Sequence, residues 1–131
     1  IDKSSIYETD PLLKPEQPKY YNMVIEINSK YDYNKLFIKL KNIEHEMGRD
    51  FYVTRNSPRI IDVDILTFNN EIVNNEMISI PHRSLHLRKF VLKPWSEISP
   101  KFNVPFYNLN VSELLNVTKD MSIIRKLDYN I

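Results

Sequence analysis

The chain has 131 residues, of which 42% are hydrophobic and 11% aromatic, enough for one domain with its own core. Its 18 basic and 17 acidic residues leave a formal net charge of +1, so we expect no nucleic-acid partner and no attraction to an anionic membrane. There is no cysteine, which excludes disulfides and thiolate sites, and no apolar run approaches the roughly 20 residues of a membrane span, so a cytoplasmic location is expected.

The first half of the chain predicts two strands and a helix. Residues Ser4–Tyr7 are typical of the end of a strand, and the prolines of Thr9–Lys19 predict a loop. Alternating apolar residues in Tyr21–Asn28 predict a second strand. Apolar residues at three- and four-residue spacings predict an amphipathic helix over Asn34–Met47, which Gly48 can end.

The second half mixes strands and short helices. A polar loop, Asp50–Ser57, precedes a predicted strand that carries Asp62 and Asp64. Two Asn-Asn pairs indicate turns in a hairpin over Phe68–Ile80. Three short helices are predicted further on, at Ser84–Val91, Val111–Leu115 and Ser122–Lys126. Because the elements do not alternate strictly as strand and helix, the predicted fold class is α+β.

Two carboxylates stand in an apolar, β-branched run, Ile60-Ile61-Asp62-Val63-Asp64-Ile65-Leu66. Side chains alternate along a strand, so Asp62 and Asp64 should share one face. Two neighbouring anions favour a cation, and Mg²⁺ prefers carboxylate oxygen while leaving positions for water and phosphates. The alternative is a solvated pair bridged to Arg55 or Arg59, which would be the more common outcome for an isolated D-x-D.

Gly48 is the single glycine of the chain. A P-loop and a dinucleotide fingerprint both need several glycines, so neither can be built here. Phosphates would have to be held by metal and by side chains with planar or charged donors. The candidates are Arg49, Arg55, Arg59, His82, Arg83, Arg88 and Lys89.

Six motifs in order resemble the 6-hydroxymethyl-7,8-dihydropterin pyrophosphokinase family, over about residues 4–100. They are Tyr7-x-Thr9 with Pro11-Leu12; Gln17-Pro18-x-Tyr20-x-Asn22; Ile43-Glu44-x-x-x-Gly48-Arg49; Ser57-Pro58-Arg59-x-Ile61-Asp62-Val63-Asp64-Ile65-Leu66; Ile80-Pro81-His82; and Arg88-x-Phe90-Val91-Leu92-x-Pro94. The resemblance implies a ferredoxin-like α+β sandwich. It also implies ATP-dependent pyrophosphoryl transfer to 6-hydroxymethyl-7,8-dihydropterin, with release of AMP, in folate biosynthesis.

The resemblance also implies roles for individual residues. Asp62 and Asp64 would bind two Mg²⁺ ions, and Arg49 and Arg59 would stabilise charge on the transferred group. The residues expected to bind nucleotide are Glu44, Ile65, Ser79, His82 and Arg88. Those expected to bind the pterin are Thr9, Leu12, Tyr20, Asn22 and Phe90. Such transfers depend on positioning and charge neutralisation more than on a strong base. Metal ligands, arginines and a histidine are the residue types that this chemistry needs.

The resemblance begins after the strand, glycine-serine-asparagine turn and helix with which the family usually opens. We therefore expect residues 1–131 to form a single, N-terminally incomplete domain of a longer polypeptide. A fused or associated folate-pathway enzyme is a candidate partner. Asn56 replaces the tryptophan that well-known members carry there. Two alternatives stay open: a non-catalytic module fused to another folate enzyme, and a different D-x-D nucleotidyl- or glycosyltransferase.

Overall fold

The computed structural model describes residues 1–10, 19–48 and 61–128. They fall into two compact units. Unit 1 combines Ile1–Asn28 with Arg83–Ile131, and unit 2 is Ser29–His82. All strand pairs in the described ranges are antiparallel, and helices accompany them in both units. The predicted α+β class is confirmed, while the extent of a single domain stays a prediction.

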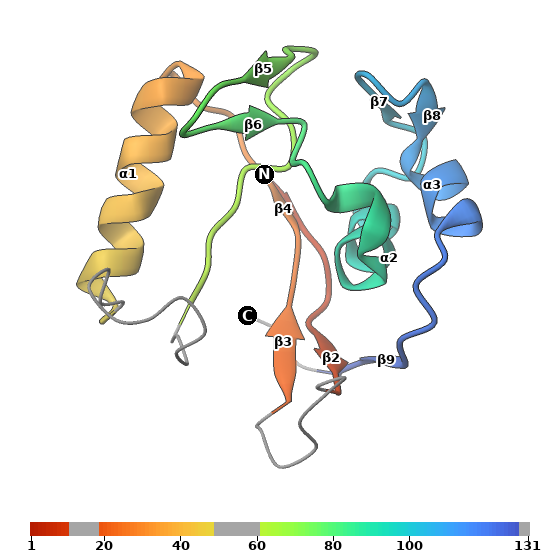
Figure 1. Ribbon diagram of the computed structural model, residues 1–131. Helices are drawn as coiled ribbons and strands as arrows, with labels where there is room; N and C mark the ends of the chain where they lie inside the picture. Colours follow the sequence, from red (N-terminus) through yellow and green to blue (C-terminus); the bar gives the residue numbers. More distant parts are fainter. Residues whose placement is uncertain (11–18, 49–60, 129–131) are drawn as a thin grey trace. The chain divides into compact units, whose positions relative to one another are not determined.

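The main sheet of unit 1 has three strands. Strand β2 (Tyr7–Thr9) lies between β3 (Tyr20–Asn22) and β9 (Ile124–Lys126), and β2 and β3 run side by side in Figure 1. A second pair joins β1 (Asp2–Lys3) to β4 (Ile25–Glu26).

The predicted strand Tyr21–Asn28 is present but divided into β3 and β4. Of the predicted strand end Ser4–Tyr7 only Tyr7 lies in a strand, and that strand, β2, continues to Thr9, where a loop was predicted. Ser4, which is buried, lies between β1 and β2. Its N–H donates to the Val24 carbonyl at 2.8 Å, and its hydroxyl accepts the Val24 N–H at 2.9 Å. A side chain thus replaces a backbone partner of the ladder at this point.

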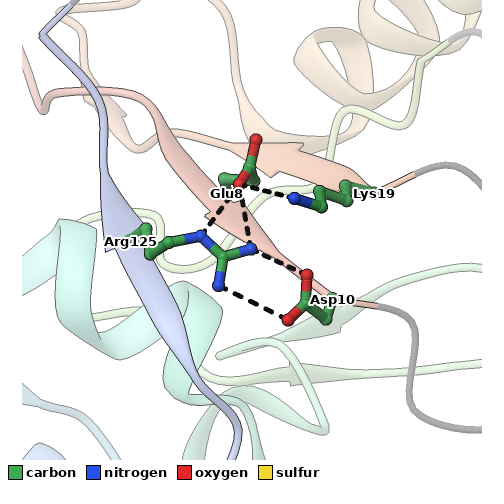
Figure 2. Close-up of polar contacts among 4 residues, drawn as sticks. All are labelled: Glu8, Asp10, Lys19 and Arg125. Atoms are coloured by element: carbon green, nitrogen blue, oxygen red, sulfur yellow. Dashed lines mark hydrogen bonds and ion pairs between the residues drawn. The ribbon is translucent and has the colours of Figure 1, made fainter. Parts of the chain in front are cut away.

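Strand β9 overturns the prediction of a helix at Ser122–Lys126. A segment this short cannot hold a helix by itself, whereas pairing with β2 satisfies its backbone groups. Figure 2 shows how a side chain strengthens this pairing: the Arg125 guanidinium contacts Glu8 at 2.9 Å and Asp10 at 2.7 Å. Hydrogen bonds to Asp10, and then to Glu8, raise the pKa of Arg125, and the same bonds lower the pKa values of both carboxyls.

The helical part of unit 1 begins where the short helix Ser84–Val91 was predicted. The structure has a 3₁₀ turn, η1 (Leu85–Leu87), followed by α2 (Lys89–Ile98), which continues past Pro94. The predicted end was wrong because buried packing of Leu92 and Trp95 outweighs the proline's missing N–H.

Helix α2 packs against β2, β3 and α3 (Val111–Val117). Helix α3 confirms the prediction at Val111–Leu115 and begins with a capping box between Asn110 and Glu113. A short hairpin precedes it, formed by β7 (Asn103–Val104) and β8 (Leu109–Asn110). The core of unit 1 comprises Tyr7, Leu85, Leu92, Trp95, Val104, Val111 and Leu114.

Unit 2 contains the helix and the hairpin that the sequence predicts. Helix α1 (Tyr33–Glu46) begins at Asp32, whose side chain accepts the Lys35 N–H, and Gly48 follows it with φ of 100°. The hairpin pairs β5 (Val73–Asn74) with β6 (Ser79–Ile80), and Asn75 closes its turn.

The predicted strand around Asp62 and Asp64 is wrong in one respect. Residues 61–68 belong to no strand of the described ranges. Val63 gives its N–H to a side chain and Leu66 gives its carbonyl to His82, so neither group forms a ladder bond.

Candidate functional site

The acidic pair lies on an alternating segment of unit 2. Asp62 and Asp64 are exposed, whereas Ile61, Val63 and Ile65 are half-buried. The alternation predicted from the sequence is thus present even though no strand ladder forms. Both carboxylates face solvent, where a cation and its water ligands can reach them.

His82 lies beside Asp64. Its Nε2 is 3.7 Å from Asp64 Oδ2, and its backbone N–H donates to the Leu66 carbonyl at 2.8 Å. The end of the hairpin is therefore tied to the segment that carries the acidic pair. Ser79 in β6 and Ile65 are both half-buried, and the Ser79 hydroxyl donates to the Pro81 carbonyl at 3.2 Å.

Glu44 differs from the other candidates because its side chain is 0% exposed. It is the buried residue of α1, a helix that the structure describes in full. Its Oε1 accepts the Val63 N–H at 2.8 Å, and Lys41 Nζ lies 3.1 Å from the same oxygen. The sequence did contain a signal, since Glu44 stands within the apolar stripe of the helix.

The candidate pterin residues of the described ranges all belong to unit 1. In the β2–β3 ladder Thr9 pairs with Tyr20, and Tyr7 pairs with Asn22. Directly paired residues, and residues two apart on one strand, share a face of the sheet. Thr9, Tyr20 and Asn22 are therefore brought to one face.

Phe90 and Arg88 stand at the beginning of α2, the helix that packs against these strands. The Arg88 guanidinium carbon lies 5.6 Å from the centre of the Phe90 ring. The stacked cation restrains both side chains. The predicted roles of Tyr20, Asn22, Phe90 and Arg88 stay predictions, although all four residues belong to unit 1, as does Thr9.

The Thr9 hydroxyl is a buried polar group that lacks a hydrogen-bond partner among the described residues. Thr9 is 5% exposed, and its Oγ1 has no hydrogen-bond partner within the described residues. A buried hydroxyl without a partner is costly, and such groups in native proteins call for an explanation. A bound ligand with a donor or acceptor at this point would satisfy it.

Strand β2 is held by a carboxylate that the sequence analysis did not single out. Glu97 of α2 accepts hydrogen bonds from the Tyr7 hydroxyl at 2.6 Å and from the Ser5 N–H and hydroxyl at 3.0 and 2.9 Å. Burial, and then the Glu97 carboxylate, raises the pKa of Tyr7 to about 12. Burial alone would raise the pKa of Glu97, but its hydrogen bonds together outweigh this and lower it. No sequence motif marked this contact.

Three predicted site residues, Leu12, Arg49 and Arg59, lie outside the described residues, as does Asn56. Within the described ranges there is no cluster of three or more His, Asp or Glu side chains that could hold a metal by itself. In the same ranges no helix has the length and apolar character needed to cross a membrane.

Fold and site together define an α+β protein with an exposed acidic pair and a neighbouring histidine. Residues 1–100 match the model of the family described as 7,8-dihydro-6-hydroxymethylpterin-pyrophosphokinase (HPPK). The chain belongs to this family. The resemblance stated from the six motifs is therefore confirmed, together with the pyrophosphokinase class, and a kinase of this kind uses ATP as co-substrate.

Known relatives cover the chain to different extents. The chain is 36% identical over 125 residues to a 2-amino-4-hydroxy-6-hydroxymethyldihydropteridine pyrophosphokinase of Haemophilus influenzae, covering 95% of this chain and 77% of the relative. It is 42% identical over 95 residues to the Bacillus subtilis protein of the same name, covering 72% of this chain and 56% of the relative. It is also 34% identical over 116 residues to the folic acid synthesis protein fol1 of Schizosaccharomyces pombe, covering 88% of this chain but 16% of that longer protein.

Proposed function

We propose that this chain transfers the pyrophosphoryl group of ATP to the hydroxymethyl group of 6-hydroxymethyl-7,8-dihydropterin, releasing AMP, in folate biosynthesis. The observation that carries the proposal is the exposed pair Asp62 and Asp64 with His82 beside it, in a chain that belongs to a pyrophosphokinase family. The names of the bacterial relatives support the same substrate.

The reaction makes one bond and breaks one. The hydroxymethyl oxygen attacks the β-phosphorus of ATP, the bond from that phosphorus to the α,β-bridging oxygen breaks, and the hydroxyl proton leaves to solvent. AMP departs with the bridging oxygen. Such a transfer depends on holding the two substrates in line and on neutralising the phosphate charge.

The residues of unit 2 suit Mg²⁺. This ion is usually held by one or two carboxylates, with waters and substrate phosphates filling its other positions, so a larger protein cluster is unnecessary. Asp62 and Asp64 would hold the metal, two ions in this proposal, and His82 would help to orient Asp64 from 3.7 Å. When bound, Mg²⁺ offsets the negative charge of the ATP phosphates.

The remaining roles follow the family resemblance. Arg49 and Arg59 stabilise charge on the transferred group, and Ser79, His82, Arg88 and Ile65 hold the nucleotide. Thr9, Leu12, Tyr20, Asn22 and Phe90 form the pterin site. The unpartnered Thr9 hydroxyl and the exposed Tyr20 ring support this last assignment, because one can bond the edge of a flat heterocycle and the other can stack on its face.

The proposal is tested by measuring AMP release from ATP and hydroxymethyldihydropterin with Mg²⁺, using the full-length protein. We compare Asp62→Asn and Asp64→Asn with Glu76→Gln, a matched change at an exposed carboxylate on the hairpin of unit 2. The aspartate variants should lose about 100-fold or more in kcat, because metal charge stabilisation amounts to several kcal/mol. Glu76→Gln should resemble the wild type, and full activity in either aspartate variant would refute the metal assignment.

The same assay separates the two alternatives. A non-catalytic module would release no AMP under any of these conditions. A different D-x-D transferase would need Mg²⁺ but would not bind the pterin, which calorimetry with hydroxymethyldihydropterin measures directly.

A further inference from the structure

We propose that Glu44 is a positioning residue of this reaction, whose buried carboxylate holds the Val63 N–H and thereby directs Asp62 and Asp64 toward the metal. The inference rests on the proposed function for the identity of the metal site. It assigns Glu44 a role that acts through the backbone, in place of a direct contact with nucleotide.

The first step is burial. A charged carboxylate that is 0% exposed is costly unless it is paired and hydrogen-bonded. Lys41, whose own side chain is 29% exposed, supplies a positive charge at 3.1 Å from Glu44 Oε1. A carboxylate buried to this degree offers no surface to an incoming nucleotide, so its role is sought in what it already contacts.

The second step is what the carboxylate contacts. The Val63 N–H donates to Glu44 Oε1 at 2.8 Å, and the Lys41 ammonium lies 3.1 Å from the same oxygen. Val63 is the residue between the two aspartates. Because the peptide unit is planar, holding this N–H fixes the orientation of the Asp62–Val63 peptide. The side chains of Asp62 and Asp64, on either side of this N–H, are exposed, whereas Val63 is half-buried.

The third step is the need for such a contact. Residues 61–68 belong to no strand of the described ranges, so ladder bonds do not set the direction of the acidic pair there. The Glu44–Val63 bond anchors one end of the segment, and the His82–Leu66 bond at 2.8 Å anchors the other. Asp62 and Asp64 lie close to the first anchor.

Two substitutions at position 44 test whether Glu44 acts by accepting the Val63 N–H or only by filling space in the core. Glu44→Gln keeps an oxygen that can accept the Val63 N–H, whereas Glu44→Met fills the same volume without an acceptor. Glu46→Met is the matched control, because Glu46 is exposed on the same helix. The measurements are kcat and KM for AMP release, the Mg²⁺ concentration that gives half-maximal rate, and the affinity for AMP without metal.

Glu44→Met should lose about 100-fold in kcat, the scale of a small misplacement of catalytic groups, and should need more Mg²⁺. Its affinity for AMP without metal should be unchanged. Glu44→Gln should stay within about tenfold of the wild type, and Glu46→Met should match it. The proposal is overturned if Glu44→Met behaves like Glu46→Met, or if both substitutions at position 44 are equally impaired.

Amide hydrogen exchange at Val63 gives a readout that needs no turnover. The Val63 N–H should be protected in the wild type and in Glu44→Gln, and rapid exchange in the wild type would refute the inference even if Glu44→Met did not fold. The two proposals can fail separately. If the wild type releases no AMP, the proposed function is rejected. The positioning role is still retained if Val63 is protected and if Glu44→Met weakens the response of the Asp62 and Asp64 amide resonances to Mg²⁺.

Discussion

Replacing Tyr7 with Phe removes one hydroxyl from the centre of the unit 1 sheet and leaves the ring in place. Tyr7 is 4% exposed, and its hydroxyl donates to Glu97 at 2.6 Å, which joins β2 to α2. A hydrogen bond to a charged group contributes about 1.5 to 3 kcal/mol. Glu97 keeps its two bonds from Ser5, so the expected loss in the free energy of unfolding is about 2 kcal/mol.

The pKa of Tyr7 predicts how the stability changes with pH. Burial, and then the Glu97 carboxylate, raises this pKa from 10.0 to about 12. The folded state favours the neutral phenol, so its contribution to the free energy of unfolding is complete below pH 10 and is lost as the pH rises from 10 to 12. In Tyr7→Phe that alkaline loss should be absent.

The assay is urea unfolding at neutral and at alkaline pH for the wild type, Tyr7→Phe, Glu97→Gln and the double variant. The double-mutant cycle isolates the coupling between the two side chains. Tyr21→Phe is the control, because Tyr21 is exposed on β3. Stability of Tyr7→Phe within about 0.5 kcal/mol of the wild type, or no coupling in the cycle, would refute the reasoning.

Two further predictions concern the same unit. Thr9→Val should leave the free energy of unfolding unchanged or raise it by about 1 kcal/mol, because the lost hydroxyl has no partner in the described residues. The same variant should bind the pterin more weakly, as measured by calorimetry. Clear destabilisation would show that the hydroxyl is bonded. Asp120→Asn should cost about 1 kcal/mol in urea unfolding, since Asp120 accepts the Lys89 N–H at 2.8 Å where α2 begins. Burial alone would raise the pKa of Asp120, but hydrogen bonds from Ser122 and Lys89 outweigh this effect and lower the pKa. The contribution of Asp120 to the free energy of unfolding should therefore be full above its ordinary pKa of 3.8 and should fade as the pH falls below that value. Equal acid sensitivity of the wild type and Asp120→Asn would contradict this.

Elements whose signals are local were predicted well. Helix α1 has its apolar spacing, its Asp32 cap and its terminal Gly48 within one stretch of sequence, and the β5–β6 hairpin has its Asn75 turn. Elements decided by distant partners were not. Residues of β9 carry no strong pattern of their own, and pairing with β2 made them a strand. Helix α2 continues past Pro94 because its buried face packs against β2, β3 and α3.

The sequence by itself determined the family, through six ordered motifs, and the alternation that exposes Asp62 and Asp64, because side-chain direction in an extended chain is a local property. Only the tertiary structure decided which distant groups meet. Burial of Glu44 against the Val63 N–H, the approach of His82 to Asp64 and the pairing of Thr9 with Tyr20 each join residues at least 11 positions apart. Such contacts depend on how the helix, hairpin and strands pack, which no local pattern contains.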